Sequence, residues 1–306
     1  MHVAIAIVGF RNHDDIVHCL SALEASTHAD FEVIICENGG PDAYARLTAA
    51  IPATLTGGRT VRAVLAPGNL GYAGGVNRCL SETPGADAWW VLNPDTLPGP
   101  GALSALVDKL AAGECDAVGC PLHLPDGTIQ SYGGLWHGWL GRPVSIGHGG
   151  AQGAPVDPAV IEQTQNYLNG ASMLVGRRFF ETVGPMREDY FLYCEEVEWC
   201  LRAVAKGLRL GFAPKAAVLH YQGTTTGAGG HAATRSRLSI YLNERNKILT
   251  TRDRFPWRLP VVVVAVLAAH TWRYVKLGAW TQLGYGLSGW WAGLRNQRGV
   301  PDWMQA

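Results

Sequence analysis

The stretch HVAIAIVGFRNHDDIVHCLSALEASTHADFEVIICEN, residues 2–38, decides the fold class. Two short runs rich in β-branched residues, 3–8 and 31–36, enclose a segment of helical period at 14–23. A strand, a helix and a second strand in this order predict two neighbouring parallel strands joined by a helix. The chain therefore begins as an α/β protein.

The same alternation continues to about residue 118. We expect helices at 44–50, 72–80 and 101–111, and strands at 61–65, 88–92 and 117–118. This order predicts a doubly wound, mostly parallel sheet with helices on both faces. Ligands of such sheets bind beyond the carboxyl ends of the strands. The first residues to consider for chemistry are therefore those at 10–12, 37–38 and 93–95.

The second half of the chain is less regular. Between about 121 and 165 the pattern is lost among Gly, Pro, Trp and His residues, which indicates loops and a hairpin whose strands the sequence does not place. A strand is expected at 167–175, a helix at 195–205, and short strands at 210–212 and 217–220.

Composition narrows the classes of function. Lys plus Arg and Asp plus Glu both number 25, so the chain has no net charge that would gather nucleic acid. The seven cysteines are scattered and never spaced as C-x-x-C, which argues against a disulfide framework or a zinc site. A reducing, cytoplasmic compartment fits this usage, and the first residues carry no signal-peptide pattern.

Asp95 and His220 are candidate metal ligands. Asp95 follows the expected strand at 88–92, where a carboxylate together with a diphosphate can hold Mg²⁺ or Mn²⁺. His220 ends another expected strand and could provide a second ligand across the cleft. Taken alone, a Pro-Asp turn explains Asp95 equally well, and a lone histidine is more often structural than a ligand.

Glu195 and Glu196 are candidate general bases. They open an expected helix, where the helix dipole favours carboxylates, and that favourable placement is itself the competing explanation. A sugar hydroxyl becomes a useful nucleophile only when its proton is removed, which a carboxylate beside a metal–diphosphate site can do. Adjacent helical positions point about 100° apart, so only one of the two carboxylates can face the acceptor.

The glycine-rich stretch GNLGYAGGVN, residues 68–77, leads into a helix and could bring backbone N–H groups close to a phosphate or ribose. A dinucleotide-binding domain is the natural competitor, with Glu37 as its ribose-binding acid. That fold needs its glycines directly after the first strand, whereas here they follow the third. The spacing therefore argues against a dinucleotide site.

The last part of the chain differs in character. From Arg254 to Arg298 there are five tryptophans and six basic residues but no acidic one. The apolar run at 261–269 is too short for a spanning helix, which needs about 20 apolar residues. We expect an interfacial helix at a membrane surface, and the alternative is a helical pair packed on the core or in a dimer interface.

Seven motifs in this order resemble the family-two glycosyltransferases with the GT-A fold, especially their bacterial rhamnosyltransferase-like branch. The resemblance covers about residues 3–250. The motifs are VGFRN (8–12), Glu37-Asn38, NLGYAGGVN (69–77), LNPD (92–95), NGASMLV (169–175), FLYCEEVEWCLR (191–202) and AVLH (217–220). Two positions depart from the family pattern: Glu37 replaces the usual Asp, and Glu195-Glu196 stands where Glu-Asp is common.

The resemblance implies an inverting, metal-dependent transfer of a hexose, rhamnose above all, from a nucleotide-diphospho-sugar to a hydroxyl of a polysaccharide or polyprenyl-linked glycan. It favours Glu196 over Glu195 as the base and leaves Glu195 as the alternative, and it implies Asp95 and His220 as ligands of Mg²⁺ or Mn²⁺. The donor site it implies comprises Phe10, Asn12, Glu37, Asn38, Asn69, Gly71, Gly75, Asn77, Asn93, Asp95, Gly170 and Ala171.

The expected organisation is a GT-A domain at 1–250 and a helical, Trp- and Arg-rich extension at 251–306. The enzyme would be cytoplasmic, with peripheral contact to the inner face of the plasma membrane or a homo-oligomer interface through that extension. Two rival functions remain: a nucleotide- or sugar-binding module without turnover, and a sugar nucleotidyltransferase. The latter would carry a basic, glycine-rich signature after the first strand, which the sequence lacks.

Overall fold

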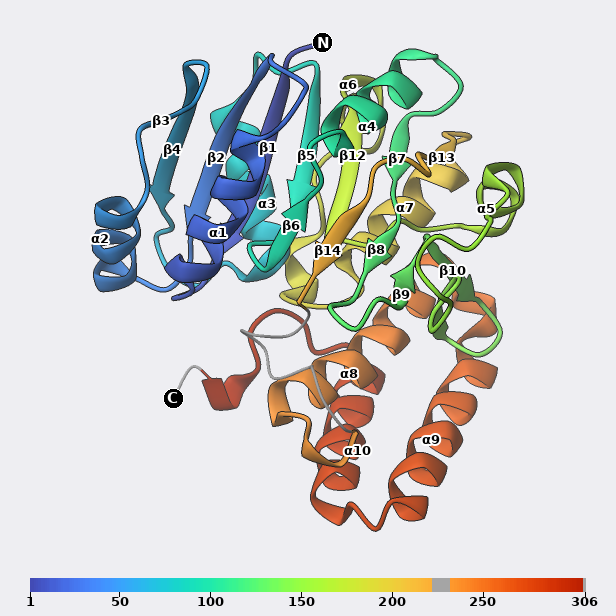
Figure 1. Cartoon of the computed structure of the whole chain (residues 1–306). Coiled ribbons are helices and arrows are strands. Elements are labelled where there is room, and N and C mark those ends of the chain that lie inside the picture. Colours follow the sequence, from blue (N-terminus) through green and yellow to red (C-terminus); the bar gives the residue numbers. More distant parts are fainter. Residues whose placement is uncertain (222–231, 305–306) are drawn as a thin grey trace.

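The computed structural model describes residues 1–221 and 232–304. Its centre is an eight-stranded sheet in the order β13-β7-β12-β5-β1-β2-β4-β3 (Figure 1). Strands β5, β1, β2 and β4 run parallel, and β12 is antiparallel to both β5 and β7. The strands are β1 Val3–Gly9, β2 Phe31–Glu37, β3 Thr54–Leu55, β4 Arg59–Leu65, β5 Ala88–Leu92, β7 Ala117–Gly119, β12 Ser172–Gly176 and β13 Leu210–Phe212.

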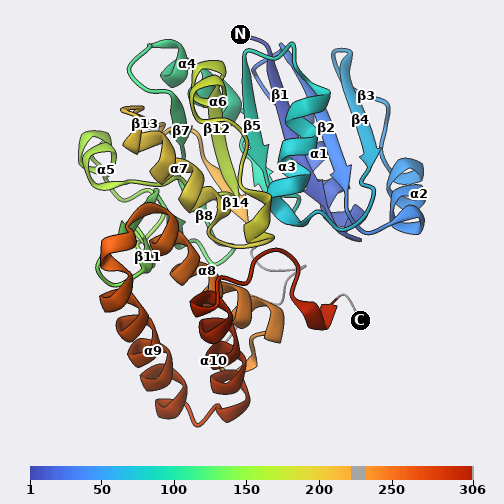
Figure 2. The ribbon, with the colours of Figure 1, turned by 180° about the vertical axis from the view of Figure 1, so that it is seen from behind.

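Helices cover both faces of this sheet (Figures 1 and 2). Alternate residues of β1 point to opposite faces: Ile5 joins a buried cluster with Leu20 of α1, whereas Ala6 joins a second cluster with Val76 of α3. The expected doubly wound arrangement is therefore present. Its helices are α1 His13–Glu24, α2 Pro41–Ala50 and α4 Ala102–Ala111 on one face, and α3 Gly71–Glu82, α6 Arg177–Val183 and α7 Glu195–Ala205 on the other.

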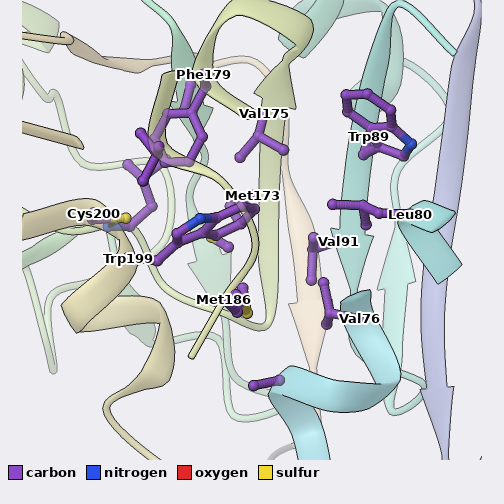
Figure 3. Packing of buried hydrophobic residues seen from close by; sticks show 14 of the residues in the cluster. Val76, Leu80, Trp89, Val91, Met173, Val175, Phe179, Met186, Trp199 and Cys200 are labelled. Carbon is purple, nitrogen blue, oxygen red and sulfur yellow. Dashed lines mark hydrogen bonds between the residues drawn. The ribbon is translucent and has the colours of Figure 1, made fainter. Parts of the chain in front are cut away.

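Helix α7 is anchored on the sheet by aromatic packing (Figure 3). Trp199 meets the ring of Phe179 edge-on, with the ring centroids 4.8 Å apart, and both belong to the cluster that contains Met173 and Val175 of β12. Burial of large aromatic rings contributes strongly to stability. The carboxylates at the start of α7 are therefore carried by a well-packed element.

Residues 121–165, whose strands the sequence left unplaced, form a hairpin and part of a second sheet. The hairpin pairs β10 Gly134–His137 with β11 Arg142–Ser145, and α5 follows at Pro158–Thr164. The second sheet has the order β6-β14-β8-β9, with β6 Thr96–Pro98, β14 Val218–His220, β8 Leu122–His123 and β9 Ile129–Ser131. Because β6 begins directly after Asp95, this sheet brings the end of β14 to the end of β5.

The expected strand at 167–175 was wrong over its first residues, because β12 begins only at Ser172. The preceding residues form a turn in which Asn169 Oδ1 accepts a hydrogen bond from the Ala171 N–H at 3.0 Å. Asn side chains stabilise turns in this way. The hydroxyl of Tyr72 donates to the Gly170 carbonyl at 2.6 Å and fixes the turn to α3.

Three long helices form a unit beside the carboxyl edge of the main sheet (Figures 1 and 2). They are α8 Arg237–Arg254, α9 Leu259–Lys276 and α10 Trp280–Leu294. Helix α10 packs along α8, and the α9–α10 hairpin projects away from the sheet. Helix α8 runs continuously across residue 250, where the sequence suggested a domain boundary, and the division of the chain at that residue stays a prediction.

The C-terminal part is helical, as expected, but one of its helices is longer than the apolar run suggested. The segment Pro256–Lys276 is continuous over 21 residues and is, by length and composition, long enough to cross a membrane. The expectation of a stretch too short to span was therefore wrong about length, because His270 and Arg273 continue the helix instead of ending it. It is the one such helix among the described residues, and length and composition alone are weak grounds for a span.

Candidate active site

A cavity of about 330 Å³ lies at the carboxyl edge of the main sheet. The ends of β1, β2, β5 and β14 and the first residues of α3 and α7 contribute to its wall. Parallel strands end at the same edge, which is why motifs far apart in the chain meet here. The predicted residues in the lining are Phe10, Asn12, Asn38, Asn69, Gly71, Asn93, Asp95, Gly170, Ala171, Glu195, Glu196 and His220.

Asp95 and His220 lie side by side in this wall, and both are almost fully buried. Antiparallel pairing of β14 with β6 sets His220 opposite Thr96, and the Tyr221 N–H donates to the Asp95 carbonyl at 3.0 Å. The Nε2 atom of His220 lies 3.2 Å from Oδ1 of Asp95. The structure thus brings the two predicted metal ligands together.

Gln130 of β9 determines which nitrogen of His220 faces Asp95. The His220 Nδ1–H donates to Oε1 of Gln130 at 2.7 Å, which turns Nε2 toward the Asp95 carboxylate, and an unprotonated Nε2 would present its lone pair there. Two acceptors held this close suit a cation that both can bind, since neighbouring ligands of Mg²⁺ at 2.0–2.1 Å are about 3 Å apart. The donor set fits Mg²⁺ or Mn²⁺.

The protein offers few ligands for such an ion. Within residues 1–221 and 232–304, no group of three or more His, Cys, Asp or Glu side chains is arranged to hold a metal. A two-residue site leaves positions for phosphate oxygens and water, as hard cations beside nucleotide phosphates commonly require. Asn93 also has a buried side-chain oxygen without a hydrogen-bond partner in the described part of the chain, and it lines the same cavity.

Glu195 and Glu196 begin α7 and line the same cavity as Asp95 and His220. The residues just before the helix have left-handed backbone conformations: φ is 67° at Phe191, 71° at Tyr193 and 66° at Cys194. Such conformations cost of order 1–3 kcal/mol each for residues other than glycine, and they concentrate at functional sites. The strained loop aims the first turn of α7 into the cavity.

The two carboxyl groups have different surroundings. Glu195 is 2% exposed, and burial together with the charge of Glu196 raises its pKa well above the usual value. Burial also raises the pKa of Glu196, whose side chain is half-buried at the cavity wall. Both carboxyl groups therefore lie in surroundings that favour uptake of a proton, as is common for general acids and bases.

Asparagine side chains line the cavity, and they also hold its loops in place by hydrogen bonds to the backbone. Asn38 donates to the Gly71 carbonyl at 2.9 Å, and Asn69 Oδ1 accepts from the Gly71 N–H at 3.0 Å. Gly71 has φ of 71°, and an added Cβ would lie 2.1 Å from the Phe191 carbonyl oxygen. Only glycine fits this contact, so the glycine-rich loop and the loop before α7 define each other's position.

Three predicted donor-site residues lie outside the cavity lining. Glu37 is buried behind it, where Oε1 accepts from two backbone N–H groups of the neighbouring loops at 2.7 and 3.1 Å. Gly75 lets α3 approach β1, since an added Cβ would lie 2.5 Å from a Val8 methyl. Asn77 donates to the Met186 carbonyl and to the Glu188 carboxylate, both at 2.9 Å. All three residues support the site from behind.

Other cavity residues were not singled out from the sequence. Val8, Tyr72, Asn169 and the 191–193 loop belong to motifs that the sequence had already marked, so their spacing could have indicated them. Leu238 of α8 and Met304 near the C-terminus also line the cavity. No local sequence pattern predicts Leu238 and Met304 as cavity residues, because only the packing of the helical unit brings them to the sheet edge.

Comparison with known proteins agrees with this geometry. Residues 5–149 match the model of "Glycosyl transferase family 2". The chain is 28% identical over 266 residues to an N-acetylglucosaminyl-diphospho-decaprenol L-rhamnosyltransferase of Mycobacterium tuberculosis, covering 79% of this chain and 82% of that protein. It is 24% identical over 261 residues to a low-salt glycan biosynthesis hexosyltransferase of Haloferax volcanii, covering 78% and 76%.

Solved structures agree in fold. The mannosyltransferase PcManGT of Pyrobaculum calidifontis, in complex with GDP-Man and Mn²⁺, superposes with a TM-score of 0.56 at 14% identity, over 97% of this chain and 88% of that one. This likeness confirms the GT-A fold that the motifs suggested. Taken with the sequence matches, it shows a glycosyltransferase whose residues 5–149 match glycosyl transferase family 2 and which resembles the rhamnosyltransferases.

Proposed function

We propose that the protein transfers a rhamnose-like hexose, with inversion, from a nucleotide-diphospho-sugar to a hydroxyl of a lipid-linked glycan or growing polysaccharide. The observation that carries the proposal is one cavity lined both by the Asp95–His220 pair and by Glu196. The mycobacterial rhamnosyltransferase, whose name specifies a decaprenol-linked acceptor, supports the sugar and the acceptor class.

The Asp95–His220 pair is the proposed binding site for Mg²⁺ or Mn²⁺. Asp95 contributes negative charge and an oxygen ligand, His220 contributes Nε2, and Gln130 orients the His220 ring through its hydrogen bond at Nδ1. A bound cation supplies positive charge that stabilises the departing nucleotide diphosphate. The Mn²⁺ in the archaeal mannosyltransferase complex supports this type of cofactor.

Glu196 is the proposed general base. Its carboxylate takes the proton of the acceptor hydroxyl while that oxygen bonds to the anomeric carbon and the bond from this carbon to the diphosphate oxygen breaks. One displacement inverts the anomeric configuration. Glu195 keeps its own proton because it is the more deeply buried of the pair, and it therefore leaves the charge on Glu196.

The remaining predicted residues are assigned to the donor. Phe10, Asn12, Asn38 and Asn69 form a wall of one aromatic and three amide side chains at the ends of β1 and β2 and before α3, which suits a nucleotide base and ribose. The residues Asn93, Gly170 and Ala171 lie nearer the carboxylates and are assigned to the sugar. Gly71, Glu37, Gly75 and Asn77 shape this wall from its backbone and from behind.

The α9–α10 hairpin is the proposed membrane contact. The exposed side of α9 carries apolar residues at helical spacing, Val261, Val264, Ala268, Trp272 and Val275, and Trp257 is exposed in the turn just before it. Val264 is 65% and Trp272 73% exposed, and the exposed face of α10 adds Trp280, Leu287 and Trp291. Such a surface is unusual for a face that meets only water.

The charges of the hairpin favour an anionic surface. Arg254 and Arg298 form ion pairs with Glu198 and Asp253 inside the protein, whereas Arg273, Lys276 and Arg295 are exposed. Basic residues beside tryptophans are typical of the headgroup region of a cytoplasmic leaflet. We infer a cytoplasmic enzyme that docks peripherally on the inner membrane face, where a polyprenyl-linked acceptor is anchored. A homo-oligomer through the same face is the competing arrangement.

The test is product analysis with a panel of nucleotide sugars, lipid-linked acceptors and Mn²⁺. The proposal predicts one glycosylated product whose new linkage has the anomeric configuration opposite to that of the donor. A retained configuration would refute single displacement. Binding of nucleotide sugars without any product over the whole panel would instead favour a binding module without turnover.

A further inference from the structure

The loop before α7 is held from behind by two adjacent residues in the middle of α8. Asn246 Nδ2 donates to the backbone carbonyls of Tyr190, Leu192 and Tyr193, at 3.1, 2.9 and 2.7 Å. Asn246 is completely buried. One amide group thus satisfies successive carbonyls of the loop whose left-handed residues precede Glu195 and Glu196.

Arg245 in turn fixes the Asn246 side chain. Its Nε–H donates to Oδ1 of Asn246 at 2.9 Å, which turns both amide N–H bonds toward the loop. The other guanidinium nitrogens donate to the carbonyls of Tyr190 at 2.8 Å and Gly299 at 2.7 Å. Arg245 is 1% exposed, and among the described residues its hydrogen-bond acceptors are all uncharged.

Burial of these two polar side chains is energetically unfavourable, and a pair that only packed a helix would not require it. Burying a guanidinium without a carboxylate partner is strongly unfavourable before its hydrogen bonds are counted. Burial accordingly lowers the pKa of Arg245 to about 10. Asn in a helix interior is also less favourable than most residues. The energetic cost is explained if the pair maintains the strained loop, whose Leu192 and Tyr193 carbonyls accept hydrogen bonds from Asn246.

We propose that Arg245 and Asn246 are positioning residues that hold the Tyr190–Cys194 loop in its left-handed conformation and thereby aim Glu196 at the acceptor hydroxyl. The inference rests on the proposed role of Glu196. The positive charge of Arg245 also favours the ionised form of the neighbouring Glu195, so it opposes the effect of burial on the carboxyl pair. The helical unit thus helps to position the proposed catalytic base, in addition to the membrane contact proposed for its hairpin.

The decisive variant is Asn246→Asp in the full-length protein. Aspartate keeps the shape of asparagine and gives Arg245 a counter-ion, but it cannot donate to the loop carbonyls. We expect kcat to fall about 10²-fold, since a misplacement of about 1 Å can cost this much, while the Kd of the nucleotide-sugar donor changes less than threefold. Asn243→Asp is the matched control, because Asn243 bonds only within α8, to the Ser239 carbonyl at 2.8 Å, among the described residues.

Arg245→Lys provides a second variant that keeps the charge but cannot hold Asn246 and the two carbonyls together. Circular dichroism and the unfolding midpoint establish that each variant is folded. A folded Asn246→Asp or Arg245→Lys protein with kcat within twofold of the parent overturns the proposal, as does an equal loss of kcat and donor affinity. Glu196→Gln, assayed in parallel, separates the two claims. If it stays active, the role of Glu196 fails, whereas if it is inactive and both α8 variants are normal, only the positioning role fails.

Discussion

The cavity at the sheet edge and the α9–α10 hairpin depart in opposite ways from the usual burial of side chains in proteins. In the cavity, polar atoms are buried without a hydrogen-bond partner in the described part of the chain, among them Glu195 Oε2, Asn93 Oδ1 and His220 Nε2. On the hairpin, large apolar side chains such as Val264 and Trp272 are exposed. Both departures are unfavourable for the isolated protein. Each indicates a ligand of the matching kind, polar and charged for the cavity and apolar for the hairpin.

The metal pair gives the largest expected effect and tests the polar half of this comparison. Excess chelator should abolish turnover, and added Mn²⁺ or Mg²⁺ should restore it. Asp95→Asn should cost more activity than His220→Ala, because the carboxylate contributes charge as well as a ligand. Gln130→Leu should weaken activity by roughly 10-fold or more through the orientation of His220. Full turnover in excess chelator contradicts the metal site.

Gly71→Ala tests how tightly the cavity loops are fitted. The left-handed φ and the contact with the Phe191 carbonyl leave no room for a methyl group, so we expect a loss of about 1–3 kcal/mol in the free energy of unfolding. Urea denaturation measures it. Gly85→Ala is the matched control, because nothing lies within 4 Å of its added Cβ. Equal stability of the two variants would mean that the two loops are not mutually constrained.

The pH dependence of kcat tests the electrostatics of the carboxyl pair. A base must be ionised, and burial raises the pKa of Glu196, so activity should fall as the pH drops through a value above the ordinary glutamate pKa of about 4.3. Full stability of the fold over that range, followed by circular dichroism, excludes acid unfolding as the cause. If kcat falls only at a pH at or below the ordinary glutamate pKa, the base is a solvated carboxylate.

Membrane docking is the smallest of these effects and tests the apolar half of the comparison. Full-length protein should co-sediment with anionic vesicles, and high salt should weaken binding without abolishing it, because exposed basic residues contribute about 1 kcal/mol each near the surface. Val264→Ser should reduce the bound fraction, whereas Val160→Ser, 55% exposed on α5, should not. Absence of sedimentation together with a dimer in solution would assign the hairpin to a second copy of the chain.

The sequence predicted the cavity better than it predicted what supports it. Asp95 and Glu196 could be placed because strand ends and helix starts are local features, and parallel strands gather their ends at one edge. Gln130, Arg245 and Asn246 could not, since their roles depend on contacts between segments distant in the chain. The same reason explains why Glu37, Gly75 and Asn77, taken from motifs, lie behind the cavity wall and not in it.

The length of helix α9 also could not be predicted from the local sequence pattern. The charged and polar residues that interrupt the apolar run lie on different faces of α9, where His270 is buried against Gly286 of α10 and Arg273 is exposed. A run-length criterion treats both as an end of the apolar segment. Packing against a neighbouring helix accommodates one of them and solvent the other, so the helix continues to Lys276.

The comparison of Glu196→Gln with Glu195→Gln tests the central claim most directly. Both changes remove one carboxylate with almost no change of shape, and kcat and the donor Kd are measured for each variant. The account predicts that Glu196→Gln lowers kcat by roughly 10²-fold or more with donor binding nearly unchanged, and that Glu195→Gln, which resembles the protonated Glu195, stays close to the parent. A large loss of kcat in Glu195→Gln together with an unchanged kcat in Glu196→Gln would contradict this account and exchange the roles of the two residues.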